Sequence, residues 1–469
     1  MMLAAYVQVA APGGLQLWVG LFDAQDPPNP VFRLNGVDIV PDVLAPFRAI
    51  RDGLNGSAGK SLNHRLIVRF PGVAADKAYR IEVIAGAERL TLSTKTLPQS
   101  LPDKLDGTFN VLLCSCYSQP EDASGLVGTI ISQIRLPVHL TLMLGDQIYG
   151  DLPLLEDLPG DQSGVARVLG EKYRRNWASA ALGSGGLGAV LARAPVACIA
   201  DDHEFWNNYP FRQTQLPHTW TAEGRQSWAT AARELYCDYQ IAGEAGGAQR
   251  IDIDPLKMLL VDMRCDRDEQ FDRLVSDATL TAIEQWADDL IAARRGGAPA
   301  VGMLSSGQAL FVRPAADSKK QSVDAEMSNY AQFGARIVPQ IERLTDAGVP
   351  LVYVTGDVHW GRVAQGIDRR TGRVMLHEVI ASPSRLIRVP LLDSAKENLN
   401  RARGIFGRAE PWPRHNAPDG VPADFGTNSR YRLECDCDHG LGFRQTGDHV
   451  AIMSFARAGS GVDFEVTYY

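Results

Sequence analysis

The hydrophobic residues of this chain gather in short, nearly unbroken runs, each of which ends in a polar cluster. The strongest example covers residues 138–151 (VHLTLMLGDQIYGD), where an apolar run stops at Gly145 and is followed by Asp146 and Tyr149. Such runs are typical of strands in a parallel sheet that is covered on both faces. Since ligands bind beyond the carboxyl ends of such strands, Asp146 and Tyr149 are expected at the functional edge of the sheet.

Other apolar runs repeat this arrangement. Run 109–116 ends in Ser115 and Cys116, and run 195–204 ends in Asp201, Asp202, His203 and Glu204. Run 257–264 ends in Asp262 and Arg264, and run 349–360 ends in Gly356, Asp357 and His359. One strand that ends in an aspartate means little, because polar residues end most strands. Several strand ends rich in Asp, His and Cys on one rim fit a metal site better than they fit solvated strand ends.

The spacing between these runs predicts the fold class. Helical patterns fall at 124–134, 165–180, 219–239, 280–295 and 325–347, and they alternate with the strands as an α/β sandwich requires. Residues 1–98 differ, because their apolar runs alternate with polar residues and are separated by Gly, Pro and Asn-Gly breaks. We therefore predict a small N-terminal all-β sandwich domain over 1–98, a linker at 99–107 and an α/β catalytic domain over 108–469.

Length, charge and cysteine content indicate the number of domains, the binding partners to expect and the cellular location. A chain of 469 residues is longer than a single hydrophobic core usually accommodates, which favours two domains. The net charge is −8 without a basic run, so a general affinity for nucleic acid or for anionic membranes is not expected. No apolar stretch is long enough to span a bilayer. The N-terminus lacks signal-peptide features and the seven cysteines are scattered, which together predict a reduced, cytoplasmic location unless a leader has been removed. Nothing in the sequence indicates the oligomeric state.

The polar strand ends also carry a family resemblance. GDQIY at 145–149, DDHEFWNN at 201–208, GDVHW at 356–360 and Ser-Cys at 115–116 resemble the PhoD family of alkaline phosphatases and phosphodiesterases, within the calcineurin-like metallophosphoesterase superfamily. The order and context of the motifs match from about 107 to 383, and the later residues match poorly. The resemblance implies a metallophosphoesterase-type sandwich behind a fibronectin III-like domain. It also implies hydrolysis of small phosphomonoesters or phosphodiesters by a hydroxide that bridges two metals.

The same resemblance implies a set of metal ligands, namely Cys116, Asp146, Tyr149, Asp202, Asp357 and His359. Asp146 takes the place of the bridging aspartate, and Tyr149 adds a phenolate to the first metal. The implied metals are Fe³⁺ with Ca²⁺, and Mn²⁺ or Zn²⁺ are alternatives in the second position. Charge counting agrees, because the thiolate, the phenolate and the carboxylates are balanced by one trivalent and one divalent ion, and a phenolate favours a strong Lewis acid.

Further residues are expected to act on the substrate. His203 matches the superfamily histidine that contacts the phosphate, so we predict that it stabilises the transition state or donates a proton to the leaving oxygen. Arg264 and Arg267 (DMRCDR) are predicted to contact phosphate oxygens, with Arg264 also counted as catalytic. Asn207 is a candidate substrate contact, although either Asn207 or Asn208 could close the second metal position. Some family members carry Arg where this chain has Gln147.

Several interpretations stay open at this point. Cys114 could take the ligand position assigned to Cys116, Tyr149 could be a capping aromatic residue, and Arg264 could form a surface ion pair. His203 could also be a strand-end histidine whose hydrogen bonds are satisfied by the protein. Cys435, Cys437 and His439 fit either a metal cluster or a solvated strand edge. Residues 401–432 show little periodicity and are expected to form a long loop, either a functional lid or a disordered segment. The alternative function is a non-catalytic metal- or phosphate-binding protein on the same fold.

Overall fold

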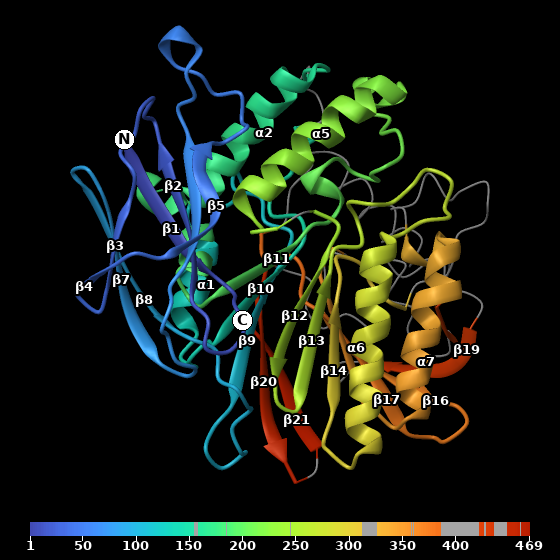
Figure 1. Ribbon diagram of the computed structural model, residues 1–469. Coiled ribbons are helices and arrows are strands. Elements are labelled where there is room, and N and C mark those ends of the chain that lie inside the picture. Colours follow the sequence, from blue (N-terminus) through green and yellow to red (C-terminus); the bar gives the residue numbers. More distant parts are fainter. Residues whose placement is uncertain are drawn as a thin grey trace.

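The computed structural model describes most of the chain (Figure 1). The described residues are 1–153, 158–183, 185–243, 245–311, 326–357, 359, 361–385, 422–425, 428–435, 448–459 and 461–469. Residues 401–421 and the side chains of Cys435, Cys437 and His439 lie outside this description.

The described residues form two large sheets and a smaller one. The first large sheet has the order β21-β20-β9-β10-β11-β1-β2-β6-β5. Its strands are β1 (Met2–Gln8), β2 (Gln16–Phe22), β5 (Asp42–Ala49), β6 (His64–Arg69), β9 (Phe109–Cys114), β10 (Leu140–Leu144), β11 (Val196–Ile199), β20 (Ala451–Ala458) and β21 (Gly461–Tyr468). Strands β9, β10 and β11 run parallel, so their carboxyl ends meet at one edge.

The second large sheet has the order β12-β13-β14-β15-β17-β16-β19-β18. Its strands are β12 (Ala248–Ile253), β13 (Leu256–Val261), β14 (Val301–Ser305), β15 (Leu351–Thr355), β16 (Arg362–Asp368), β17 (Val374–Ile380), β18 (Pro422–Phe425) and β19 (Asn428–Cys435). β13, β14, β15 and β17 are mutually parallel. The carboxyl ends of β13, β14 and β15 therefore also share an edge.

The apolar strand residues explain why the two large sheets stack. Val111 and Leu142 of the first sheet belong to the same buried cluster as Met258, Met303 and Val352 of the second. Every residue of β9, β10, β14 and β15 is buried, which is the burial pattern of strands covered on both faces. The continuous apolar runs of the sequence therefore fill the space between the sheets.

Helices cover the outer faces of both sheets (Figure 1). α1 (Leu126–Gln133), α2 (Gln162–Trp177), α3 (Ser179–Leu182), α4 (Leu187–Leu191) and α5 (Ala222–Tyr239) pack on or beside the first sheet. α6 (Asp277–Arg295) and α7 (Val338–Asp346) pack on the second. This arrangement confirms the predicted α/β sandwich.

The N-terminal region is all-β, as predicted. A smaller sheet of β4 (Val37–Ile39), β3 (Val31–Leu34), β7 (Ala78–Ala85) and β8 (Glu88–Lys95) packs against β1, β2 and β6 through one apolar cluster. The layer β1-β2-β6-β5 is also continuous with the first large sheet, because Gln8 of β1 pairs in parallel with Val196 of β11. The boundaries at 98 and 107 stay a prediction.

The C-terminal residues differ from the expectation. Residues 422–425 and 428–432, expected within a loop, lie in strands β18 and β19, and β19 pairs with β16. β20 and β21, which the sequence analysis did not assign, extend the first sheet through antiparallel pairing of β20 with β9. β21 alternates half-buried and exposed residues, and a one-sided strand of this kind gives a weaker sequence signal than a buried run.

Candidate metal centre

The backbone at the shared strand edge is held in an uncommon conformation. Cys116, Asp146, Asp357 and His359 have φ angles of +52°, +56°, +62° and +59°, in the left-handed region that non-glycine residues rarely adopt. Each such residue costs roughly 1–3 kcal/mol, and residues of this kind concentrate at functional sites. Gly145 is required by close approach, because a Cβ there would lie 2.5 Å from Asp201 Cβ. The turns after β9, β10 and β15 are therefore shaped to present side chains and not to continue the strands.

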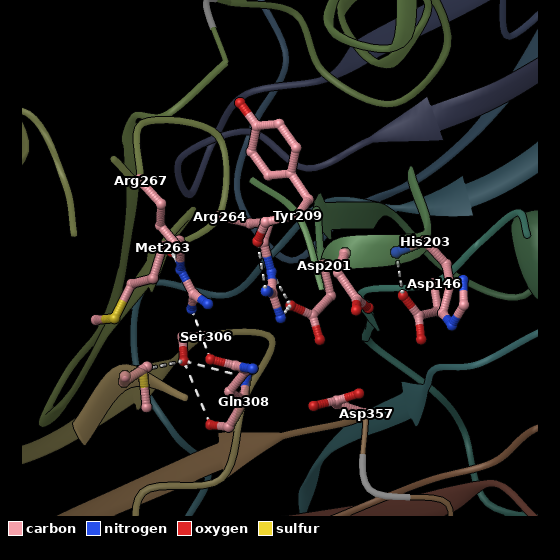
Figure 2. A network of polar contacts seen from close by, with 12 residues as sticks. Asp146, Asp201, His203, Tyr209, Met263, Arg264, Arg267, Ser306, Gln308 and Asp357 are labelled. Atoms are coloured by element: carbon pink, nitrogen blue, oxygen red, sulfur yellow. Dashed lines mark hydrogen bonds and ion pairs between the residues drawn. The ribbon is translucent and has the colours of Figure 1, made fainter. Parts of the chain in front are cut away.

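These turns bring together groups of metal-ligand side chains. Among the described residues, ligand atoms lie within 4.8 Å of one another in three groups: Cys116, Asp146 and His359; Asp146, Asp202 and His203; and Asp146, Asp201, Asp202 and Asp357. Asp146 belongs to each group. Figure 2 shows the carboxylates of Asp146, Asp201 and Asp357 turned toward a common space. The geometry therefore offers adjacent cation positions that share Asp146.

Tyr149 lies on the Cys116 side of this cluster. Its hydroxyl oxygen is 3.3 Å from His359 Nε2, and Cys116 Sγ is 3.5 Å from Asp146 Oδ2. Burial raises the pKa of the Tyr149 hydroxyl, and the neighbouring Cys116 and Asp146 raise it further. Cys114 is found elsewhere, in the apolar cluster beneath the helices of the first sheet. The turn at Cys116 thus separates two cysteines that strand alternation would place on one face.

The concentration of buried acidic groups suits a cation. Burial raises the pKa of the Asp146 carboxyl, and Asp202 and Asp201 raise it further against the opposing effect of His203. Asp201 Oδ2, Asp202 Oδ1 and Asn208 Oδ1 are buried and have no hydrogen-bond partner among the described residues. Buried oxygen atoms of this kind are costly unless a donor or a metal satisfies them. The donor set therefore fits metal binding, and Asn208 joins Asp202 through its backbone N–H at 2.7 Å from Asp202 Oδ2.

His203 lies beside Asp146 and is oriented by Asp151. The His203 backbone N–H donates to Asp146 Oδ1 at 3.1 Å, and His203 Nδ1 lies 2.8 Å from Asp151 Oδ1. Burial lowers the pKa of the imidazole, but Asp151, Asp202 and Asp146 outweigh that effect and raise the pKa well above its usual value. With Nδ1 engaged by Asp151, Nε2 is the nitrogen that remains for a ligand. Asp151 was not predicted, although it follows Tyr149 by two residues in the same turn.

Glu204 joins the turns that carry Asp146 and Asp202. Its carboxylate accepts the backbone N–H groups of Asp146 at 2.9 Å, Gln147 at 2.7 Å and Asp201 at 2.9 Å, and the Gln240 amide at 3.1 Å. Burial raises the pKa of Glu204 to about 7, against the lowering effect of these hydrogen bonds. Glu204 is thus a buried tie between neighbouring turns and not a surface acid.

The residues predicted to contact phosphate are engaged by other protein groups, and Figure 2 shows Arg264 and Arg267 among them. The Arg264 side chain is 1% exposed and its Nε donates to Asp201 Oδ1 at 2.6 Å, so this ion pair is buried and not a surface pair. Arg267 donates to the Met263 carbonyl and, at 2.6 Å, to Gln308 Oε1. Asn207 donates its backbone N–H to Asp151 Oδ2 at 2.9 Å.

The fold and the position of the ligand groups can now be compared with known structures. Two stacked mixed sheets with helices on both outer faces form an α/β sandwich, and the candidate metal-ligand side chains lie at its strand ends. Comparison with solved structures gives PhoD at a TM-score of 0.58 and 13% identity, covering 99% of this chain and 89% of that chain. This likeness shows that the chain has a PhoD-like fold.

Other comparisons add little. GAP50 of Plasmodium, described as the anchor in the inner membrane complex, aligns at a TM-score of 0.34 and 10% identity over 77% of this chain and 84% of its own. No family model and no curated protein sequence matches the chain. Among the described residues, no helix combines the length and apolar character needed to cross a membrane.

Proposed function

We propose that this protein is a metal-dependent phosphoesterase that hydrolyses small phosphomonoesters or phosphodiesters at a dinuclear centre. The observation that carries the proposal is the position of Asp146, which belongs to each of the candidate ligand groups among the described residues. A carboxylate shared by adjacent positions is what a two-metal hydrolase requires, because both metals must act on one phosphate. The PhoD-like fold supports the proposal.

The ligands would divide into two sets that share Asp146. One set comprises Cys116, Asp146, Tyr149 and His359, and it would hold Fe³⁺, since thiolate and phenolate favour a strong Lewis acid. The other comprises Asp146, Asp202 and Asp357, which would hold Ca²⁺, or else Mn²⁺ or Zn²⁺. The buried Asn208 Oδ1 atom adds a carbonyl oxygen suited to the second set. When bound, the metals would polarise the phosphate and lower the pKa of coordinated water.

The chain's own residues would position the substrate around these metals. His203, held by Asp151 through Nδ1, would donate from Nε2 to a phosphate oxygen or to the leaving oxygen. Arg264 is engaged by Asp201, so its positive charge would act on the phosphate across the buried wall while it fixes Asp201. Arg267 and Asn207 would complete the substrate side, with Arg267 oriented by Gln308.

The proposal is tested by assaying the purified protein with p-nitrophenyl phosphate and bis(p-nitrophenyl) phosphate, together with metal analysis. We expect turnover that is lost with a chelator and restored by iron with calcium. Full activity in the presence of excess chelator, with no bound metal, would overturn the proposal. Metal-loaded protein that turns over neither ester would instead favour the alternative, a non-catalytic metal- or phosphate-binding protein.

A further inference from the structure

The segment that follows β17 is fastened to the turn that carries Cys116. The Ser384 backbone N–H donates to the Ser115 carbonyl at 2.7 Å, and the Arg385 N–H donates to the Cys116 carbonyl at 3.1 Å. In return, the Ser115 N–H donates to Ser384 Oγ at 3.0 Å. Residues 381–385 therefore lie along the turn after β9, although more than 250 residues separate them in the sequence.

Ser382 lies in this segment and contacts two of the proposed ligands. Its side chain is fully buried, at 0% exposure. Ser382 Oγ lies 3.1 Å from Cys116 Sγ and accepts the backbone N–H of His359, also at 3.1 Å. The His359 N–H occupies one acceptor position of the hydroxyl, and the hydroxyl proton is available for donation to the sulfur. A thiolate sulfur has no proton to donate, so with Cys116 as a metal-bound thiolate this contact is an O–H···S hydrogen bond.

We propose that Ser382 is a positioning residue of the metal centre, which holds Cys116 Sγ and the His359 backbone for one metal and tunes the thiolate by hydrogen bonding. The inference rests on the proposed function, because it assumes that Cys116 and His359 bind the same metal. Neither the sequence motifs nor the ligand groups include Ser382.

Two physical arguments support this role. Cys116 Sγ is close to the acidic Asp146, and a hydrogen bond from Ser382 offsets part of the repulsion that a thiolate would meet there. Groups that hydrogen-bond to metal ligands orient those ligands and alter the electron density that they donate. His359 has a φ of +59°, so its N–H needs an acceptor that holds this backbone conformation in place.

The chain supplies a matched control for Ser382. Ser384 is buried in the same segment, but its hydroxyl accepts from the Ser115 backbone and not from a ligand. Ser382→Ala and Ser384→Ala each delete one buried hydroxyl at positions two residues apart. Ser382→Thr retains the hydroxyl and serves as the conservative variant.

The experiment measures iron binding by chelator competition and the iron–sulfur stretch of the Fe³⁺-loaded protein by resonance Raman spectroscopy. We expect Ser382→Ala to weaken iron binding by roughly 10- to 100-fold. We also expect the iron–sulfur stretch to move to higher frequency, because the sulfur then donates more electron density to iron. Ser384→Ala should leave the iron affinity and the iron–sulfur stretching frequency unchanged. Ser382→Thr should have the iron affinity and stretching frequency of the wild type. In metal-free protein, amide hydrogen exchange at His359 should be faster in Ser382→Ala than in Ser384→Ala.

The outcomes separate this inference from the proposed function. If the wild-type protein binds iron and Ser382→Ala matches Ser384→Ala in affinity, stretching frequency and exchange, the inference is wrong while the proposed function stands. If the wild-type protein binds no metal under any loading condition, both fail together. A loss of iron binding shared equally by both alanine variants would indicate general loosening of the segment, which also overturns the specific role of Ser382.

Discussion

Asp146 is the residue at which the candidate metal positions meet. Its carboxyl is fully buried, its backbone is left-handed, and it accepts the N–H of His203. These features are mutually dependent, because the left-handed turn after β10 is what directs the side chain into the space between the sheets' strand ends. One substitution at this residue should therefore separate metal binding from folding.

We expect Asp146→Asn to lose both metals and essentially all activity while it remains folded. The amide has nearly the same shape as the carboxylate, but it is neutral and cannot bridge two cations. The metal-free variant should unfold at the same temperature as the metal-free wild type or higher, because burial and the adjacent Asp202 disfavour a charge at this residue. Calorimetry with metal analysis checks this, and wild-type turnover with full metal content would contradict it.

His203 should affect chemistry without emptying the metal site. Its ring nitrogen contacts Asp151, and its backbone contacts Asp146, so the side chain can be removed without deleting a carboxylate. We expect His203→Ala to lower the maximal rate by roughly 10²- to 10³-fold, as for one lost donor to developing charge. Metal content is the discriminating measurement. Loss of bound metal in parallel with activity would make His203 a ligand.

At the scale of elements, α2 holds the loop that follows β10. Lys172 Nζ donates to the carbonyls of Tyr149 at 2.8 Å and Gly150 at 2.7 Å, and Asn176 donates to the Gln147 carbonyl at 2.5 Å. Because Asp146, Tyr149 and Asp151 all lie on this loop, α2 contributes to the site without supplying a ligand. The helix is thus a support for the candidate centre as well as a cover for the sheet.

We expect Lys172→Met to lower stability by roughly 1–3 kcal/mol, since carbonyls in a partly buried setting lose a charged donor. Turnover should fall with it, because the turn that carries Tyr149 loosens. Arg175→Met is the matched control, as Arg175 is an exposed residue of the same helix and loses the same charge. Urea unfolding of both variants provides the comparison, and equal midpoints would show that Lys172 does not secure the loop.

At the scale of the whole molecule, the N-terminal strands are joined to the helices beside the site through one buried acid. Asp238 of α5 is 0% exposed and meets Arg48, Arg51 and Arg65 of the N-terminal layer. The Trp18 indole also donates to the Asp238 carbonyl at 2.8 Å. The N-terminal strands and helix α5 therefore share a core and an ion-pair network.

Removing the Asp238 carboxylate leaves the buried Arg65 without its carboxylate partner and takes one partner from Arg48 and Arg51. We therefore expect Asp238→Ala to cost roughly 3–5 kcal/mol at pH 7. Burial would raise the pKa of Asp238, but its hydrogen bonds and ion pair with Arg51 outweigh burial and lower it. A lowered folded pKa means that the stabilisation is present above the unfolded pKa and is lost as pH falls through the folded value. The difference between wild type and variant should therefore shrink in acid below about pH 4.

Glu234→Ala is the control for this substitution. Glu234 lies on the same helix and approaches Arg51 at 3.4 Å, but its side chain is 31% exposed. Exposed pairs contribute only about 0–1 kcal/mol. Urea unfolding at neutral and acidic pH measures both variants, and a cost for Asp238→Ala no larger than that for Glu234→Ala would show that the buried network does not join the two regions.

The sequence by itself determined the strands of the core and where their polar ends lie. A run such as 140–144 is buried on both faces, and the carboxyl ends of parallel strands share an edge, so the nearness of Asp146 and Asp202 follows from local pattern and general topology. The positions of α1, α2, α5 and α6 followed from periodicity in the same way, whereas within the described part of the helix expected at 325–347, α7 covers only Val338–Asp346. These features depend on residues that are close together in the chain, which is why they could be predicted from a single sequence.

Only the tertiary structure decided which side chains meet at that edge. The contacts of Ser382 with Cys116, of Arg264 with Asp201 and of Asp151 with His203 depend on strand order, turn conformation and loop packing. The left-handed turn at Cys116 places Cys116, and not Cys114, among the candidate ligands, and no sequence periodicity predicts that turn. The pairing of β20 with β9 joins residues more than 300 positions apart. Such contacts are determined by the packing of the whole chain, and a local hydrophobic pattern does not predict them.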